Sequence, residues 1–330
     1  MTPEQLGELR ERLPAFADNE TVTPLQREFC RFYEMDFSDR LPLVEYRMGA
    51  VRSGDYTLAV HRWLQPGASG NLLLVHGYFD HSGLFCKLIE YGLSLNCNVL
   101  IFDLPGHGLS SGETAAIDDF ADYGHAVAAV LEAASLPGLP LWVMAQSTGC
   151  AALVEYARHH GWPFAAAVML APLVRPFGWR RARLAHSLVR PFAGSVERKF
   201  APNSTDREFL AFLQRDPLQS RRLPVRWVTA LRRWIASLPA GDIGAGPALI
   251  VQGDADRTVD WRYNTAFYCG LFPGSQVVVL PGAGHQLANE APALRQAYLK
   301  DVASWLALRG LSSIVDGTLT GASSGISRDK

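Results

Sequence analysis

Ser147 lies where an apolar run gives way to a helix-forming run, in the stretch LWVMAQSTGCAALVEYA (residues 141–157). A nucleophilic serine needs an exposed hydroxyl, a base to accept its proton, an acid to orient that base, and donors for the oxyanion. A tight strand-to-helix turn exposes the hydroxyl and requires small residues two positions before and after it. Ala145 and Gly149 occupy those positions, one methyl group away from the usual G-x-S-x-G. The stretch favours a nucleophile at Ser147 over a serine in an ordinary loop.

Candidates for the acid and the base follow two later apolar runs. Asp256 lies in GDADRTV after one run, and His285 lies in the glycine-rich GAGHQ after the next. The order Ser, Asp, His, with each residue just past the end of a strand, is one of the known orders for a catalytic triad. Asp254 is the alternative acid. The competing interpretation makes these residues turn or capping residues and His285 a structural histidine.

Two backbone N–H groups are expected to form the oxyanion hole. One belongs to Thr148, directly after the nucleophile, and the other to Tyr78 in the loop HGYFDHSG (76–83). A further loop, DLPGHGLSSG (103–112), is expected at the same edge of the sheet. Four polar residues of these loops are expected to hold loop geometry rather than to catalyse: His76, His81, Asp103 and His107.

The elements that must position these residues alternate between strand and helix. Residues 44–54 and 56–67 predict a hairpin, with the turn at Ser53-Gly54-Asp55. Short, continuous apolar runs are typical of buried parallel strands, and they span residues 71–77, 97–103, 139–145, 165–171, 247–253 and 275–282. Helical patterns lie between most of them, at 117–134, 148–160 and 260–271, and a last one spans 286–309. The pattern predicts an α/β fold: a doubly wound, mostly parallel sheet covered on both faces.

Residues 172–240 interrupt this alternation with short helical stretches, many prolines and no strand pattern. They contain 14 Lys and Arg against 4 Asp and Glu, so this segment carries +10 and the rest of the chain −11. An insertion between two core strands lies over the edge of the sheet where ligands bind. We therefore expect five parts: a helical extension (1–43), the first core part (44–171), a helical cap (172–240), the second core part (241–310) and a disordered tail (311–330).

Composition excludes several classes of protein. The chain has 330 residues, 48% of them hydrophobic, and a formal net charge of −1, so nothing indicates nucleic-acid binding. It has no apolar run of 18 or more residues, and its N-terminus lacks the pattern of a signal peptide. Five cysteines without close pairing argue against a disulfide framework. We expect a cytoplasmic protein that uses neither a metal nor another cofactor.

The blocks HGYFDHSG, FDLPGHGLSSG, AQSTG, GDADRTV and GAGHQ together resemble the α/β-hydrolase superfamily. The resemblance is to its monoacylglycerol lipase and lysophospholipase group, also called serine aminopeptidase-like, and extends over residues 56–308. It implies a triad and an oxyanion hole at the five residues identified above, and a cap at 172–240 that shapes an acyl pocket. Ala145 departs from the family motif, and the cap sequence gives no match.

The expected reaction is hydrolysis of a carboxylic ester of a fatty acyl chain, such as a lysophospholipid or a monoacylglycerol, through an acyl-enzyme on Ser147. Peptidase, acyltransferase or lyase chemistry with the same triad stays open, as does a non-catalytic binding protein. Residues 178–192 and 225–238 wind as basic amphipathic helices. Such helices either contact anionic lipid surfaces or pair with the acidic body of the protein.

Overall fold

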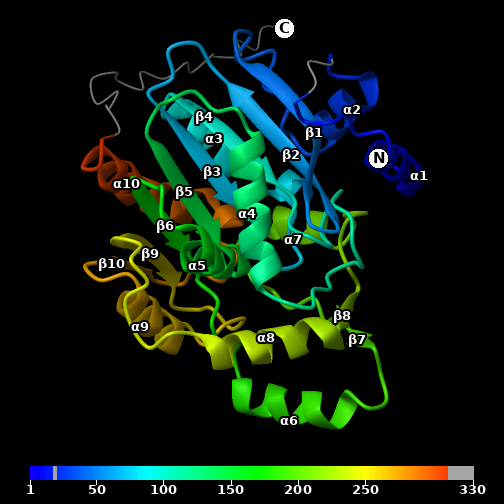
Figure 1. The fold of residues 1–330 in the computed structure, drawn as a ribbon, viewed down its shortest axis with the longest axis vertical. Coiled ribbons are helices and arrows are strands. Elements are labelled where there is room, and N and C mark those ends of the chain that lie inside the picture. Colours follow the sequence, from blue (N-terminus) through cyan, green and yellow to red (C-terminus); the bar gives the residue numbers. More distant parts are fainter. Residues whose placement is uncertain (18–20, 311–330) are drawn as a thin grey trace, which may run out of the picture.

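An eight-stranded sheet forms the centre of the molecule (Figure 1). The computed structural model describes residues 1–17 and 21–310. In spatial order, the strands are β1 (Glu45–Ser53), β2 (Tyr56–Leu64), β4 (Cys97–Phe102), β3 (Gly70–Val75), β5 (Leu141–Gln146), β6 (Ala166–Leu170), β9 (Ala248–Gly253) and β10 (Gln276–Leu280). The pairs β1–β2 and β2–β4 are antiparallel, and all other neighbours are parallel. The predicted doubly wound, mostly parallel sheet is confirmed.

The sequence explains which strands lie inside the sheet. Every residue of β3, β4, β6 and β9 is buried, as continuous apolar runs require when helices cover both faces. The predicted hairpin pairs Ser53 with Tyr56, and Gly54 makes the turn with a φ of 55°, which glycine adopts at little cost.

Two apolar cores lie on opposite faces of the sheet. The first contains residues of α4 (Ala121–Ala133), α5 (Thr148–His160) and α9 (Trp261–Leu271). The second contains residues of α3 (Cys86–Ser94) and α10 (Pro292–Ala307). The helix predicted at 286–309 begins only at Pro292, because proline suits a first helical turn, and a 3₁₀ turn (Leu287–Asn289) precedes it.

The insertion between β6 and β9, residues 172–240, contains α6 (Trp179–Val189), α7 (Arg207–Leu213) and α8 (Val225–Ser237). Figure 1 shows α8 beneath the sheet and α6 outermost. The expectation that this segment has no strand was wrong, because β7 (Ser195–Glu197) and β8 (Arg222–Pro224) form an antiparallel ribbon. Each strand is only three residues long, too short for a periodic signal in the sequence.

The N-terminal extension forms α1 (Pro3–Glu11) and α2 (Pro24–Phe32). Each helix begins with a reciprocal capping box, at Thr2 and at Thr23. Apolar side chains of α2 and the following turn join the second core, so the extension packs against the sheet domain. Within residues 1–17 and 21–310, no helix is long and apolar enough to cross a bilayer. The predicted tail, 311–330, lies outside the described residues.

Candidate active site

Ser147 occupies a strained turn between β5 and α5. Its φ of 52° and ψ of −113° place a non-glycine residue in a region that L-residues rarely adopt. A Cβ on Gly149 would lie 2.3 Å from the carbonyl oxygen of Val75, so only glycine fits two positions after the serine. The methyl group of Ala145, two positions before, is fully buried and accommodated. The local sequence therefore produces the turn, including its departure from G-x-S-x-G.

The structure brings Ser147, His285 and Asp256 within hydrogen-bond distance of one another. His285 Nε2 lies 3.0 Å from Ser147 Oγ, and His285 Nδ1 lies 2.8 Å from Asp256 Oδ2. The second carboxylate oxygen of Asp256 accepts the backbone N–H groups of Thr258 (2.7 Å) and Val259 (3.1 Å). The carboxylate is thus fixed on both sides, and a histidine held in this way can accept a proton from the serine.

The electrostatics of this pair favour the ion pair formed when His285 becomes charged. Burial alone lowers the pKa of His285, but the charge and hydrogen bond of Asp256 outweigh it, so the pKa lies above its usual value. Burial raises the pKa of Asp256, but His285 and the backbone N–H groups outweigh it and hold the pKa below its usual value. Asp256 is therefore ionised across the neutral range.

The alternative acid, Asp254, has a different role. Its side chain accepts the N–H of Gly282 at 2.7 Å, and the residue is exposed. It joins the ends of β9 and β10 and has no hydrogen bond to His285. Of the two aspartates in this loop, only Asp256 contacts the histidine.

Thr148 directly follows Ser147, and Tyr78 lies in the 76–83 loop, which approaches the serine. Thr148 is the first residue of α5, and the N–H groups of the first helical turn have no acceptor within the helix. Among the described residues, no acceptor bonds the N–H of Tyr78. A Cβ on Gly77 would lie 3.2 Å from Ser147 Cβ, which shows how closely the 76–83 loop approaches the serine. Both N–H groups are available to an oxyanion.

The four loop-ordering residues bond as expected for that role. His76 Nε2 accepts the N–H of Leu104 at 2.9 Å, and Asp103 accepts the N–H groups of Ser82 and Leu109, both at 2.7 Å. His107 Nδ1 bonds the carbonyl of Pro105 at 2.9 Å. The fourth residue, His81, pairs at 2.8 Å with Asp216 of the insertion, and Asp216 also accepts the hydroxyl of Tyr33 at 2.8 Å.

Sequence reasoning missed a buried amide network beside the triad. Gln146 donates to Gln286 Oε1 at 2.6 Å, and Gln286 donates to Asp80 Oδ1 at 2.7 Å. Gln146 Oε1 accepts the N–H of Ala288 at 2.9 Å. The network joins the strand before Ser147, the loop of His285 and the 76–83 loop. A signal was present in the sequence, since each glutamine is the direct neighbour of a triad residue.

The insertion covers this site from two directions. The carbonyl of Asn203 accepts the N–H of His285 at 2.9 Å. The indole of Trp227 on α8 stacks on the ring of Tyr78, with 3.8 Å between centroids. Ser147 is 6% exposed.

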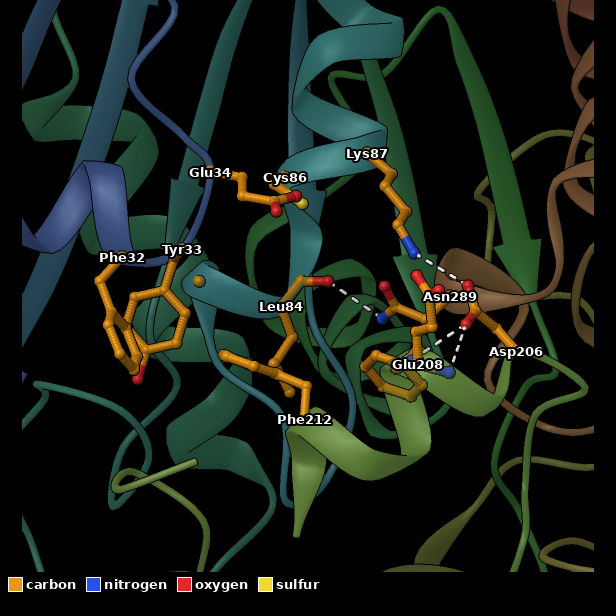
Figure 2. Close-up of a pocket in the computed structure, with 12 residues that line it drawn as sticks. Phe32, Tyr33, Glu34, Leu84, Cys86, Lys87, Asp206, Glu208, Phe212 and Asn289 are labelled. Atoms are coloured by element: carbon orange, nitrogen blue, oxygen red, sulfur yellow. Dashed lines mark hydrogen bonds and ion pairs between the residues drawn. The ribbon is translucent and has the colours of Figure 1, made fainter. Parts of the chain in front are cut away.

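A separate cavity of about 230 Å³ lies between the extension, the start of α3 and α7. Figure 2 shows Phe32, Tyr33 and Phe212 around its apolar part and Lys87 reaching toward Asp206. The ion pair between these two measures 3.3 Å. None of the triad residues lines this cavity, so it is distinct from the space beside Ser147.

The fold and the arrangement around Ser147 define an α/β hydrolase. The sequence profile of the serine aminopeptidase S33 family matches residues 66–292, more than half of the chain. The human monoglyceride lipase is 26% identical over 265 residues, covering 75% of this chain and 86% of its own. The monoacylglycerol lipase of Mycolicibacterium smegmatis is 25% identical over 256 residues, covering 72% of this chain and 88% of its own.

Solved structures agree on the fold. A soluble variant of the monoglyceride lipase from Saccharomyces cerevisiae superposes with a TM-score of 0.70 at 19% identity, covering 82% of this chain and 97% of its own. The chain belongs to the serine aminopeptidase S33 family of α/β hydrolases. Within this family, the chain is similar to proteins named monoacylglycerol or monoglyceride lipases.

Proposed function

We propose that this chain hydrolyses carboxylic esters of fatty acyl chains, of the monoacylglycerol or lysophospholipid type, through a Ser147–His285–Asp256 triad. The observation that carries the proposal is the hydrogen-bonded series from Ser147 Oγ through His285 to Asp256, held at the carboxyl ends of parallel strands. The lipase names of its relatives support the substrate class.

The mechanism follows from the positions of these groups. Ser147 Oγ attacks the ester carbonyl while His285 Nε2 accepts its proton, and the tetrahedral oxyanion receives the N–H groups of Tyr78 and Thr148. His285 then gives the proton to the leaving alcohol, which leaves an acyl group on Ser147. Water repeats the cycle and releases the fatty acid. Asp256 keeps the proton of neutral His285 on Nδ1 and stabilises the charged ring.

Residues 172–240 serve as the cap of this site in the proposal. Trp227 and Asn203, both from the insertion, contact Tyr78 and His285 directly, so the insertion forms the roof against which an acyl chain would lie. The unpaired state of all five cysteines supports a reducing, cytoplasmic location.

The outer helix α6 is proposed to contact anionic lipid surfaces. Leu184 and Leu188 are each 64% exposed, and Phe192, just beyond the helix, is 89% exposed. Within the described residues, none of the arginines of α6 forms an ion pair, whereas Arg226 on α8 pairs with Glu113 and Asp118 of the core. We therefore assign a different role to each basic helix. The helix α8 pairs with the acidic body of the protein, and α6 faces outward and contacts lipid.

The direct test compares wild type with Ser147→Ala on p-nitrophenyl esters of increasing acyl length, together with fluorophosphonate labelling. Wild type is expected to label and to turn over, with an acyl-length optimum that measures the pocket, and Ser147→Ala to do neither. A variant that keeps both label and activity would refute the nucleophile. Product analysis separates free fatty acid from an amine or a transferred acyl group, and so separates ester hydrolysis from peptidase or acyltransferase chemistry.

A further inference from the structure

Five planar groups contact one another in a row that includes the ring of Tyr78, whose N–H is the proposed oxyanion donor. Neighbouring members are separated by 3.8, 4.0, 3.9 and 4.4 Å in the order Trp227, Tyr78, Phe79, Arg198 and Phe200. The 76–83 loop supplies the two middle rings, and the insertion supplies the groups on both sides. The insertion therefore places a guanidinium directly against the residue that follows the proposed oxyanion donor.

Arg198 is held in this row by one end of its guanidinium. Nη1 donates to Gln219 Oε1 at 2.8 Å and to the carbonyl of Ser220 at 3.2 Å. Gln219 in turn donates to the carbonyl of Phe79 at 2.8 Å, and Phe79 has a φ of 66°, a strained value for a non-glycine residue. Arg198 is thus fixed relative to the 76–83 loop, and its remaining donors cannot rotate freely.

The other edge of the guanidinium carries two N–H donors, on Nε and Nη2, without a partner among the described residues. Neither Nε nor Nη2 is fully buried, so both donors are accessible to solvent. No carboxylate within residues 1–17 and 21–310 lies within ion-pair distance of Arg198. Burial lowers the pKa of Arg198 to about 10, against the opposing effects of Asp80 and Tyr78, so the group stays cationic at neutral pH.

Such an edge is suited to bind an anion. Two parallel N–H donors on a planar, permanently charged group match two oxygens of a phosphate or carboxylate. Phe79 directly follows Tyr78, and the guanidinium of Arg198 lies 3.9 Å from the ring of Phe79, so a headgroup that extends from an ester carbonyl at the N–H of Tyr78 toward Phe79 would meet Arg198. Among acyl esters of glycerol, the headgroup that offers an anionic oxygen pair is the phosphate of a lysophospholipid.

We propose that Arg198 binds the phosphate group of an anionic lysophospholipid substrate and so determines headgroup specificity. This inference rests on the ester hydrolysis proposed above and selects one of its two substrate classes. It makes Arg198 a specificity residue, whereas a purely structural role would make it only a support for Phe79.

The test measures kcat and KM on decanoyl lysophosphatidylglycerol and decanoyl monoacylglycerol, both below their micelle-forming concentrations. Arg198→Gln is expected to lower kcat/KM for the phospholipid about 10- to 100-fold, mainly through KM, and to change the neutral ester less than about threefold. Arg198→Lys should retain part of the preference. Glycerol 3-phosphate should inhibit wild type competitively and Arg198→Gln more weakly by a similar factor.

Arg221→Gln is the matched control, because Arg221 is an exposed arginine of the same insertion whose guanidinium lies 6.0 Å from the ring of Phe200. It is expected to leave both substrates unchanged. Equal losses on both substrates in Arg198→Gln, or no loss on either, would overturn the phosphate subsite while leaving the ester hydrolase intact. Absence of hydrolysis and of fluorophosphonate labelling in wild type would instead overturn the proposed function, and the subsite with it.

Discussion

The main-chain carbonyl of Asn203 accepts the N–H of His285 at 2.9 Å. The same carbonyl accepts the N–H of Gln286 at 2.8 Å. The insertion is therefore bonded to the backbone of the proposed general base, and not only laid over the site. Because these bonds are main-chain bonds, the insertion determines the position of His285 without contributing a side chain to the chemistry.

This contact predicts that Gly284→Ala lowers kcat. A Cβ at this position would lie 2.6 Å from the carbonyl oxygen of Asn203, so the backbone on one side must move. A shift of His285 by about 1 Å can cost about 100-fold in rate, and we expect a loss of about 10- to 100-fold in ester hydrolysis.

Gly270→Ala is the control for that substitution, since it lies within α9 and a Cβ there meets no atom within 4 Å. We expect this variant to keep wild-type kcat and to gain about 0.5–1 kcal/mol in the free energy of unfolding, measured in urea. Full activity in Gly284→Ala would show that the Asn203 contact does not position His285.

Asp256 and Asp254 lie in the same loop, but we expect replacement by asparagine to lower kcat strongly only at Asp256. Asp256→Asn removes the charge that orients His285 and presents an amide that favours the wrong tautomer, so kcat should fall about 10³- to 10⁴-fold. Asp254→Asn should change kcat less than about threefold, because the side chain of Asp254 is exposed and, among the described residues, accepts only the N–H of Gly282. Steady-state kinetics on one p-nitrophenyl ester suffices. A larger loss in Asp254→Asn would reverse the assignment of the acid.

The pH dependence of kcat/KM should report the raised pKa of His285. Burial lowers this pKa, but Asp256 outweighs burial and raises it above 6.5. His285 must be neutral to accept the proton of Ser147, so activity falls as the pH drops through the raised pKa, and the acidic limb lies above pH 6.5. In Asp256→Asn, burial is no longer outweighed and the limb should move to lower pH. A wild-type limb below pH 6 would contradict the electrostatic argument.

The sequence predicts those parts of the site that short-range rules determine. The turn at Ser147 depends on Ala145 and Gly149, both within two residues, and the parallel strands are continuous apolar runs. These features depend on the residue types within a turn and on the pattern of apolar residues along a strand. A single sequence shows both. The roles of His76 and Asp103 follow instead from the predicted topology, because the ends of neighbouring strands bring their loops and hydrogen-bond partners together.

The sequence does not predict contacts made by the insertion. Arg198, Asn203 and Asp216 lie between the helices and strands of the insertion. Arg198 contacts Phe79, 119 residues away, Asn203 bonds His285, 82 residues away, and Asp216 bonds His81, 135 residues away. Periodicity predicts which side chains form the apolar face of α6, but not that this face is exposed. A helical pattern states which side chains share a face, whereas the neighbour that buries or exposes that face depends on the path of the whole insertion.

The exposed face of α6 predicts binding to anionic vesicles. Leu184→Gln together with Leu188→Gln removes two apolar side chains, each 64% exposed, that would enter the lipid interface. Co-sedimentation with phosphatidylglycerol-containing vesicles should weaken at least about tenfold. Binding should also fall as salt rises, because the arginines of α6, which form no ion pair with any described residue, contribute electrostatically. The matched control is Val277→Thr with Val279→Thr, two valines on β10 that are 40% and 44% exposed and lie outside the insertion. Equal vesicle binding by all three proteins would mean that the face of α6 does not contact lipid.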